Sequence, residues 1–151
     1  MKAFWLPVAV LTLSLGTNFA LADTYSGVLC RASGANSALG YNQWGVYNQS
    51  VTDTTTVVCG SHSAGGVHEV SITTYDRSST QDLTCTVHLV NGAGDDLESP
   101  VTRQTSGFGN RPQTTAVARF NGSIGTVIVE CTLPPWDGTN GGSGIAGYQI
   151  L

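Results

Sequence analysis

Lysine is almost absent from this sequence. The 151 residues include six Lys and Arg residues against ten Asp and Glu residues, and Lys2 is the one lysine. So few cations exclude a nucleic-acid-binding surface, which needs clustered positive charge, and they exclude attraction to anionic lipid. Without lysine beyond position 2, the chain also has no Schiff-base lysine, phosphate-loop lysine or Ser-Lys catalytic pair.

The sequence also lacks any apolar pattern of helical period. Short runs of β-branched residues alternate with clusters of Gly, Ser, Thr and Asn, a pattern typical of all-β domains. It predicts a single β-sandwich, jelly-roll or immunoglobulin-like, of about eight strands with two disulfides. The expected strands are 27–31, 41–48, 54–59, 67–75, 83–90, 114–120, 126–132 and 145–150.

The N-terminal segment predicts export. Lys2 is followed by a mostly apolar stretch over residues 4–15 and by the small-residue motif Ala20-Leu21-Ala22. These are the three parts of a signal peptide at 1–22, and the mature domain is expected at 23–151. A transmembrane anchor fits less well because the apolar run is short and interrupted by polar residues. We therefore expect a secreted or periplasmic protein with no membrane segment after cleavage.

Two segments with strand alternation each carry a cysteine in the apolar row. Cys85 alternates with Val87 and Leu89, and Cys131 follows Val127 and Val129 at the same period. If both rows face one core, these two cysteines can form a disulfide inside the sandwich.

The four cysteines suit an oxidising compartment. They are Cys30, Cys59, Cys85 and Cys131. No pair has the CxxC spacing of a zinc or thioredoxin-like site, and four cysteines allow three pairings. Strand parity favours Cys85 with Cys131, which leaves Cys30 with Cys59.

Aromatic residues supply the candidate ligand-binding positions. In a strand over residues 41–48, Trp44 would face the core, whereas Tyr41 and Tyr47 would lie on the other face. Trp136 follows a double proline and is expected in an exposed loop. Tyr41, Tyr47 and Trp136 in one open strip would favour a polysaccharide ligand, whereas an unpaired edge strand would favour assembly.

Two groups of residues are candidate metal ligands. His62 and His68 lie near each other in sequence, but strand parity separates His68 from the neighbouring Glu69. The second group supplies hard oxygen atoms that suit calcium: Asp95, Asp96 and Glu98. Their spacing does not match an EF-hand loop, and solvated turn residues are the simpler interpretation, so no cofactor is expected unless calcium binds here.

Nucleophilic catalysis has little support in the sequence. The segment around Ser61 and Ser63 lacks the Gly-x-Ser-x-Gly pattern and joins two expected strands instead of a strand and a helix. Ser63, His88 and an aspartate would provide the residue types of a triad, but a triad is defined by geometry. The sequence therefore predicts a protein that is not an enzyme.

Several motifs resemble those of a group of small exported bacterial proteins with no assigned activity. The matching motifs are Tyr41-Asn42-x-x-Gly45-Val46-x-Asn48-x-Ser50, Thr56-Val57-Val58-Cys59, Thr84-Cys85-Thr86-Val87, Glu130-Cys131-Thr132-Leu133-Pro134-Pro135 and Gly144-Ile145-x-x-Tyr148. The resemblance, over residues 41–150, implies a periplasmic or secreted β-sandwich with two disulfides. Proline often follows the second cysteine in that group, whereas Gly60 follows Cys59 here, so the next loop is expected to differ. The resemblance supplies no catalytic residues.

Two functions are consistent with these observations. The first is a non-enzymatic structural or interaction module of the cell envelope or extracellular space, with a protein partner or self-assembly through a strand edge that has no lysine. The alternative is a carbohydrate-binding module that uses Tyr41, Tyr47 and Trp136, an analogy at the level of fold.

Overall fold

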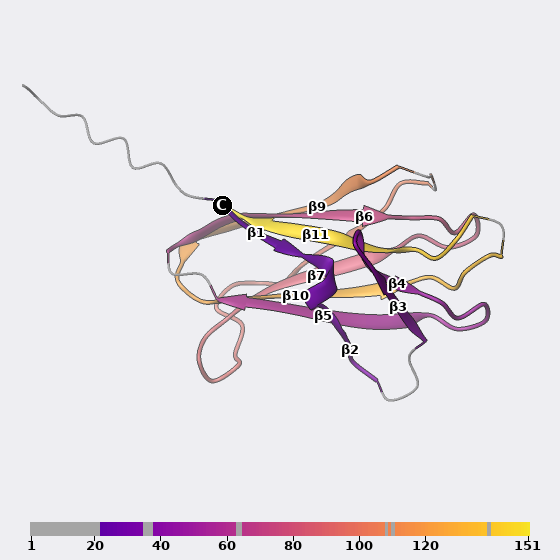
Figure 1. Ribbon diagram of the computed structural model, residues 1–151. Coiled ribbons are helices and arrows are strands. Elements are labelled where there is room, and N and C mark those ends of the chain that lie inside the picture. The colour runs from indigo at the N-terminus through magenta and orange to yellow at the C-terminus, as the bar shows by residue number, and fades with distance from the viewer. Residues whose placement is uncertain (1–21, 35–37, 63–64, 108, 110, 139) are drawn as a thin grey trace, which may run out of the picture.

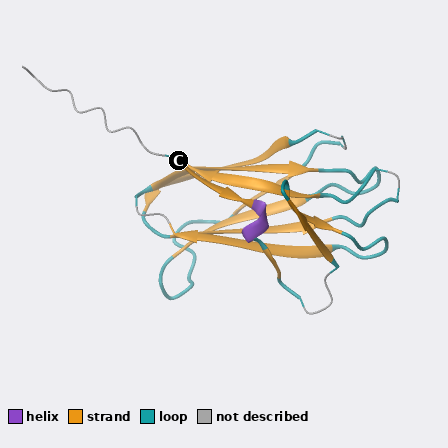
Figure 2. Cartoon of the chain, viewed as in Figure 1, coloured by secondary structure: helices purple, strands orange, loops and turns teal. Residues whose placement is uncertain are grey.

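The computed structural model describes residues 22–34, 38–62, 65–107, 109, 111–138 and 140–151, with the backbone alone at 61–62 and 114–117. The expected signal peptide, apart from Ala22, lies outside these residues. Two antiparallel sheets pack face to face (Figure 1), and strands make up most of the regular structure (Figure 2). The elements are β1 (Asp23–Ser26), the 3-10 turn η1 (Gly27–Leu29), β2 (Arg31–Ala32), β3 (Leu39–Asn42), β4 (Gly45–Asn48), β5 (Thr55–His62), β6 (Val67–Tyr75), β7 (Thr84–Val90), β8 (Val101–Gln104), β9 (Gln113–Ser123), β10 (Thr126–Leu133) and β11 (Gly144–Ile150).

The predicted β-sandwich is confirmed. One sheet has the strand order β3-β4-β11-β6-β9, with β1 also paired to β11, and the other has the order β2-β5-β10-β7-β8. β1 and β4 share one edge of β11: β1 pairs with residues 147–150, and β4 pairs with Gly144 and Ile145. The described part of the chain contains no helix with the length and apolar character needed to cross a membrane.

The core lies between the sheets and follows the alternation read from the sequence. Cys85, Val87 and Leu89 on β7 are fully buried, as are Val127 and Val129 on β10. Their side chains point into the core because alternate residues of a strand face the same side of the sheet. Val70, Ile72 and Ile145 of the six-stranded sheet belong to the same core cluster.

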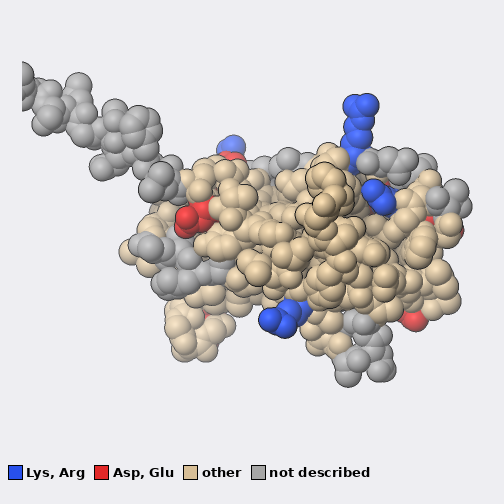
Figure 3. Space-filling view, viewed as in Figure 1, with Lys and Arg blue, Asp and Glu red and all other residues tan. Residues whose placement is uncertain are grey.

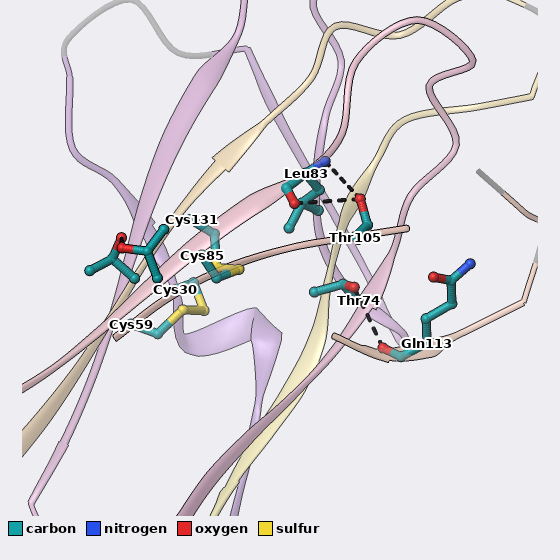
Figure 4. The surroundings of a disulfide bond; sticks show 10 residues. Cys30, Cys59, Thr74, Leu83, Cys85, Thr105, Gln113 and Cys131 are labelled. Carbon is teal, nitrogen blue, oxygen red and sulfur yellow. Dashed lines mark hydrogen bonds between the residues drawn. A yellow bond between two sulfur atoms is a disulfide. The ribbon is translucent and has the colours of Figure 1, made fainter. Parts of the chain in front are cut away.

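Both predicted disulfides are present (Figure 4). Cys85 and Cys131 are direct register partners on neighbouring strands of one sheet, so this disulfide links β7 covalently to β10. Cys30 lies between η1 and β2 and bonds to Cys59 on β5. This second bond fixes the chain where it crosses from one sheet to the other.

The predicted strand at 41–48 is a hairpin. The chain reverses at Gln43 and Trp44, with Asn42 and Gly45 paired across the turn. The Trp44 amide donates to Asn42 Oδ1 at 2.7 Å, and Gly45 has a φ of 134°. Such a turn favours Asn and Gly. The prediction that Trp44 is a core residue is therefore wrong: its side chain is 62 % exposed.

The predicted strands also differ from the structure at three other places. Residues 27–29 of the expected strand 27–31 form the 3-10 turn, in which Ser26 caps the Val28 amide. β1 and β8 were not predicted, and β8 shows why, since its residues are exposed or partly exposed without alternation. An edge strand of this kind has no apolar periodicity to detect.

Candidate functional site

A cavity of about 630 Å³ lies where β4, the start of β11 and the end of β6 meet. Its lining is aromatic and glycine-rich. The lining residues are Asn42, Trp44, Gly45, Val46, Tyr47, Gln49, Tyr75, Arg77, Pro112, Trp136, Gly141, Gly142, Gly144 and Ile145. This size falls in the range of ligand-binding cavities in proteins.

Four aromatic side chains from three parts of the sequence line this cavity. Trp44 stands in the β3–β4 turn, Tyr47 follows on β4, Tyr75 ends β6, and Trp136 lies in the loop after β10. Trp44 is well exposed, whereas the other three are partly buried. Aromatic rings present flat apolar faces, and Tyr and Trp add a polar group at the ring edge.

Asn48 holds the Trp136 loop against the end of β4. This buried amide donates from Nδ2 to the carbonyl oxygens of Leu133 at 3.2 Å and Pro134 at 3.1 Å. The Trp136 amide donates to the Ser50 carbonyl at 2.7 Å, and the Ser50 amide donates to Asn48 Oδ1 at 2.9 Å. One asparagine thus fixes the position of a tryptophan that lies 88 residues away (136 minus 48).

Arg77 is placed in the cavity by a second buried polar group. The carboxylate of Asp76, fully buried, accepts hydrogen bonds from Thr105 Oγ1, from the Leu83 amide at 3.2 Å and from Ser143 Oγ at 3.3 Å. Ser143 Oγ in turn accepts from the Arg77 amide at 2.9 Å. Figure 4 shows the Thr105 hydroxyl beside the Leu83 backbone. The backbone of Arg77 is therefore tied to both β6 and the loop before β11.

The Arg77 side chain stacks on an aromatic ring of the cavity. Its guanidinium carbon lies 5.5 Å from the centre of the Tyr75 ring, a cation–π contact. A Cβ at Gly141, where φ is 90°, would lie 2.7 Å from Arg77 Nη1, so glycine permits this close approach. Among the described residues, two buried side-chain nitrogen atoms have no hydrogen-bond partner: Arg77 Nε and Trp136 Nε1. Both residues line the cavity.

Charged side chains are sparse on the face of the molecule shown in Figure 3. Within the part of the chain that the structure describes, the ion pairs are His88 with Asp96, at 3.1 Å, and Arg119 with Glu69, at 3.4 Å. None of these four residues lines the cavity.

The structure separates the three aromatic residues predicted to bind a ligand. Tyr47 and Trp136 line the cavity, but Tyr41 does not. Tyr41 is 52 % exposed, and its hydroxyl donates to the Cys30 carbonyl at 3.2 Å. Trp136 lies in a loop as expected, yet it is partly buried instead of exposed. The open strip of all three residues is therefore not formed.

The candidate metal ligands do not converge. Asp95 accepts from Asn91 Nδ2 at 3.3 Å, and Asp96 contacts His88. Glu98 turns instead to Asn121, whose amide it binds at 3.0 Å. His68 is exposed on β6.

The remaining predicted positions lie outside what the structure describes: the side chain of His62, and Ser63. Across the described residues, no group of three or more His, Cys, Asp or Glu side chains is placed to hold a metal ion.

Sequence reasoning missed Trp44, Tyr75 and Arg77 as cavity residues. For Trp44 a signal was available, since the run Asn42-Gln43-Trp44-Gly45 has the turn residues of a tight hairpin and would place the indole at its tip. Tyr75 and Arg77 gave no such signal, because only the pairing of β6 with β11 brings them to this site.

Comparisons with known proteins show similarity of fold. No family model and no curated protein matches the sequence. Among solved structures, the chain is similar to the CBM36-1 domain of a multidomain xylanase from the hindgut metagenome of Trinervitermes trinervoides, with a TM-score of 0.52 and 15 % identity over 87 % of this chain and 97 % of that domain. It is also similar to CBM86, a low-affinity xylan-binding module from Roseburia intestinalis, with a TM-score of 0.51 and 12 % identity over 87 % of this chain and 95 % of the module. At these identities the comparisons show a shared fold alone.

Proposed function

We propose that this protein is an exported, non-enzymatic module that binds a polysaccharide in the aromatic cavity. The observation that carries the proposal is the arrangement of Trp44, Tyr47, Tyr75 and Trp136 around one cavity. Sugar rings have apolar faces and polar edges, so they stack on aromatic rings while their hydroxyl groups form hydrogen bonds. The sandwich fold shared with two carbohydrate-binding modules supports the same proposal. The two disulfides fit a protein exported to an oxidising compartment.

The polysaccharide alternative is thus better supported than a purely structural role. Xylan is the first ligand to test, because the two similar domains belong to a xylanase and to a xylan-binding module. We expect weak to moderate affinity, because a small cavity contacts few sugar units.

Binding to a panel of soluble glycans, measured by calorimetry on residues 23–151, tests the proposal. Trp44→Ala should weaken binding by about tenfold or more, because it removes one stacking surface. Stability should be unchanged, since Trp44 is 62 % exposed. Tyr41→Ala is the matched control, because it removes an exposed aromatic of the same hairpin that does not line the cavity, and it should bind normally.

The binding measurement is repeated with a calcium chelator, because Asp95, Asp96 and Glu98 are the candidate calcium ligands. These residues lie outside the cavity, so we expect the protein to bind glycan without calcium. A wild-type protein that binds no glycan, or a Trp44→Ala variant that binds as tightly as wild type, would overturn the proposal.

A second candidate function is assembly through a sheet edge. β9 is the longest strand and forms an edge of the six-stranded sheet in the described residues, with Arg119 as its one basic residue. Edge strands can pair with a partner strand when no lysine or proline prevents it. Sedimentation velocity over a range of concentrations distinguishes this function: assembly with no glycan binding would favour it, whereas a monomer that binds glycan would exclude it as the main role.

A further inference from the structure

We infer that the glycan bound in the cavity carries a carboxylate, as a uronic acid unit does, and that the guanidinium of Arg77 binds this carboxylate. The inference rests on the proposed function and specifies its ligand. Among the described residues that line the cavity, Arg77 is the only charged one. Any charge on the ligand at this site would therefore meet a single cation.

No carboxylate of the described protein neutralises Arg77. The neighbouring Asp76 carboxylate is already occupied by Thr105, Leu83, Ser78 and Ser143. The ion pairs of the described residues involve other groups, and Arg77 Nε has no hydrogen-bond partner. A partly buried guanidinium whose Nε has no partner gains from a nearby anionic acceptor, because a buried donor without a partner is energetically costly.

Arg77 is also held ready for such a ligand. Its backbone amide is bonded to Ser143, its guanidinium lies against the Tyr75 ring, and Gly141 allows the loop to approach Nη1. The planar guanidinium matches a carboxylate with two parallel hydrogen bonds, and its stacking on an aromatic ring limits the entropy lost on binding. Trp136, which lines the same cavity, also has a buried side-chain nitrogen, Nε1, without a hydrogen-bond partner.

The overall charge favours an isolated acidic group over a densely charged polymer. The chain has a formal net charge of −4, so a polyanion would be repelled by most of the surface. A mostly neutral glycan with occasional uronic acid branches would place one carboxylate at Arg77 and its neutral units against the aromatic rings.

The experiment compares glucuronic acid-substituted xylan, the same polymer after carboxyl reduction, and polygalacturonate as a dense polyanion. Affinity is measured for the wild type, Arg77→Gln, Arg77→Lys and Arg103→Gln. The last variant is the matched control, because it removes the same charge from β8, and Arg103 does not line the cavity. Circular dichroism checks that each variant is folded.

We expect the wild type and Arg103→Gln to bind the acidic xylan about tenfold more tightly than the reduced polymer, and polygalacturonate weakly. Arg77→Gln should weaken binding of the acidic xylan about tenfold more than binding of the reduced polymer, and Arg77→Lys should show a smaller difference between the two polymers. Two results would overturn this inference and leave the proposed function standing. One is equal affinity of the wild type for both xylans, and the other is an equal loss of affinity for both polymers in Arg77→Gln. If the wild-type protein bound neither a glycan of the panel nor any of these three polymers, both the inference and the proposed function would be overturned.

Discussion

The five-stranded sheet and the loops around the cavity are stabilised by different means. The sheet has both disulfides and an unbroken apolar face, with Val57, Val87 and Val129 fully buried. The cavity loops instead depend on two buried polar side chains, Asn48 and Asp76. Burial and covalent links stabilise the sheet over many contacts, whereas each loop depends on a few directional bonds. Mutations in the sheet should therefore affect stability alone, and mutations of the polar side chains should affect both stability and binding.

The largest effect is expected from loss of a disulfide. Replacing Cys85 and Cys131 by alanine should lower the free energy of unfolding by about 4 kcal/mol, because their separation of 46 residues closes a long loop in the unfolded chain. Replacing Cys30 and Cys59, which are separated by 29 residues, should cost slightly less. Urea unfolding measures both effects. Glycan affinity of the folded protein should remain unchanged, and a loss of affinity would contradict the separation between sheet and cavity.

An intermediate effect is expected at Asn48. Asn48→Ala should lower stability by about 2 to 3 kcal/mol, because it leaves buried backbone groups of the Trp136 loop without partners. It should also weaken glycan binding, since Trp136 is no longer held in place.

Asn91→Ala is the matched control for Asn48→Ala. The Asn91 side chain also accepts backbone hydrogen bonds, from Ala93 and Asp95, in a turn that does not line the cavity. This variant should be less destabilised and should bind normally. If Asn48→Ala retained full affinity, Asn48 would have no role in positioning the site.

The smallest effect is expected at Tyr41. Tyr41→Phe removes the hydrogen bond from its hydroxyl to the Cys30 carbonyl and should cost about 0.5 to 1 kcal/mol in thermal unfolding experiments. Glycan affinity should stay the same. Reduced glycan affinity in this variant would show that Tyr41 belongs to the binding site, as the sequence predicts.

The sequence was a good guide wherever strands alternate. Alternation around Cys85 and Cys131 predicts two strands, their buried faces and the pairing of the cysteines, and the structure confirms all three. Strand alternation reports directly which side chains face the core.

The candidate site was harder to predict because it is built from turns and from residues far apart in the sequence. The apolar character of Trp44 was mistaken for burial, although the turn residues on either side of it place the indole in solvent. Arg77 reaches the cavity because a buried aspartate fixes the loop that precedes β7, a tertiary interaction that leaves no periodic pattern.

The pairing of β1 with β11 sets where the chain ends lie relative to the cavity, which matters when the domain is linked to other domains. Asp23 pairs with Ile150, so the two ends of the domain lie side by side (Figure 1). The cavity is lined by Gly144, at the opposite end of β11. β11 has seven residues, which span about 20 Å in extended chain, so a linker attached at either end of the domain would start about this far from the cavity. Tandem copies could engage one polysaccharide together and gain avidity. A circular permutant that joins residue 151 to residue 23 and opens at the exposed turn 92–95 would move the attachment point without rebuilding the cavity.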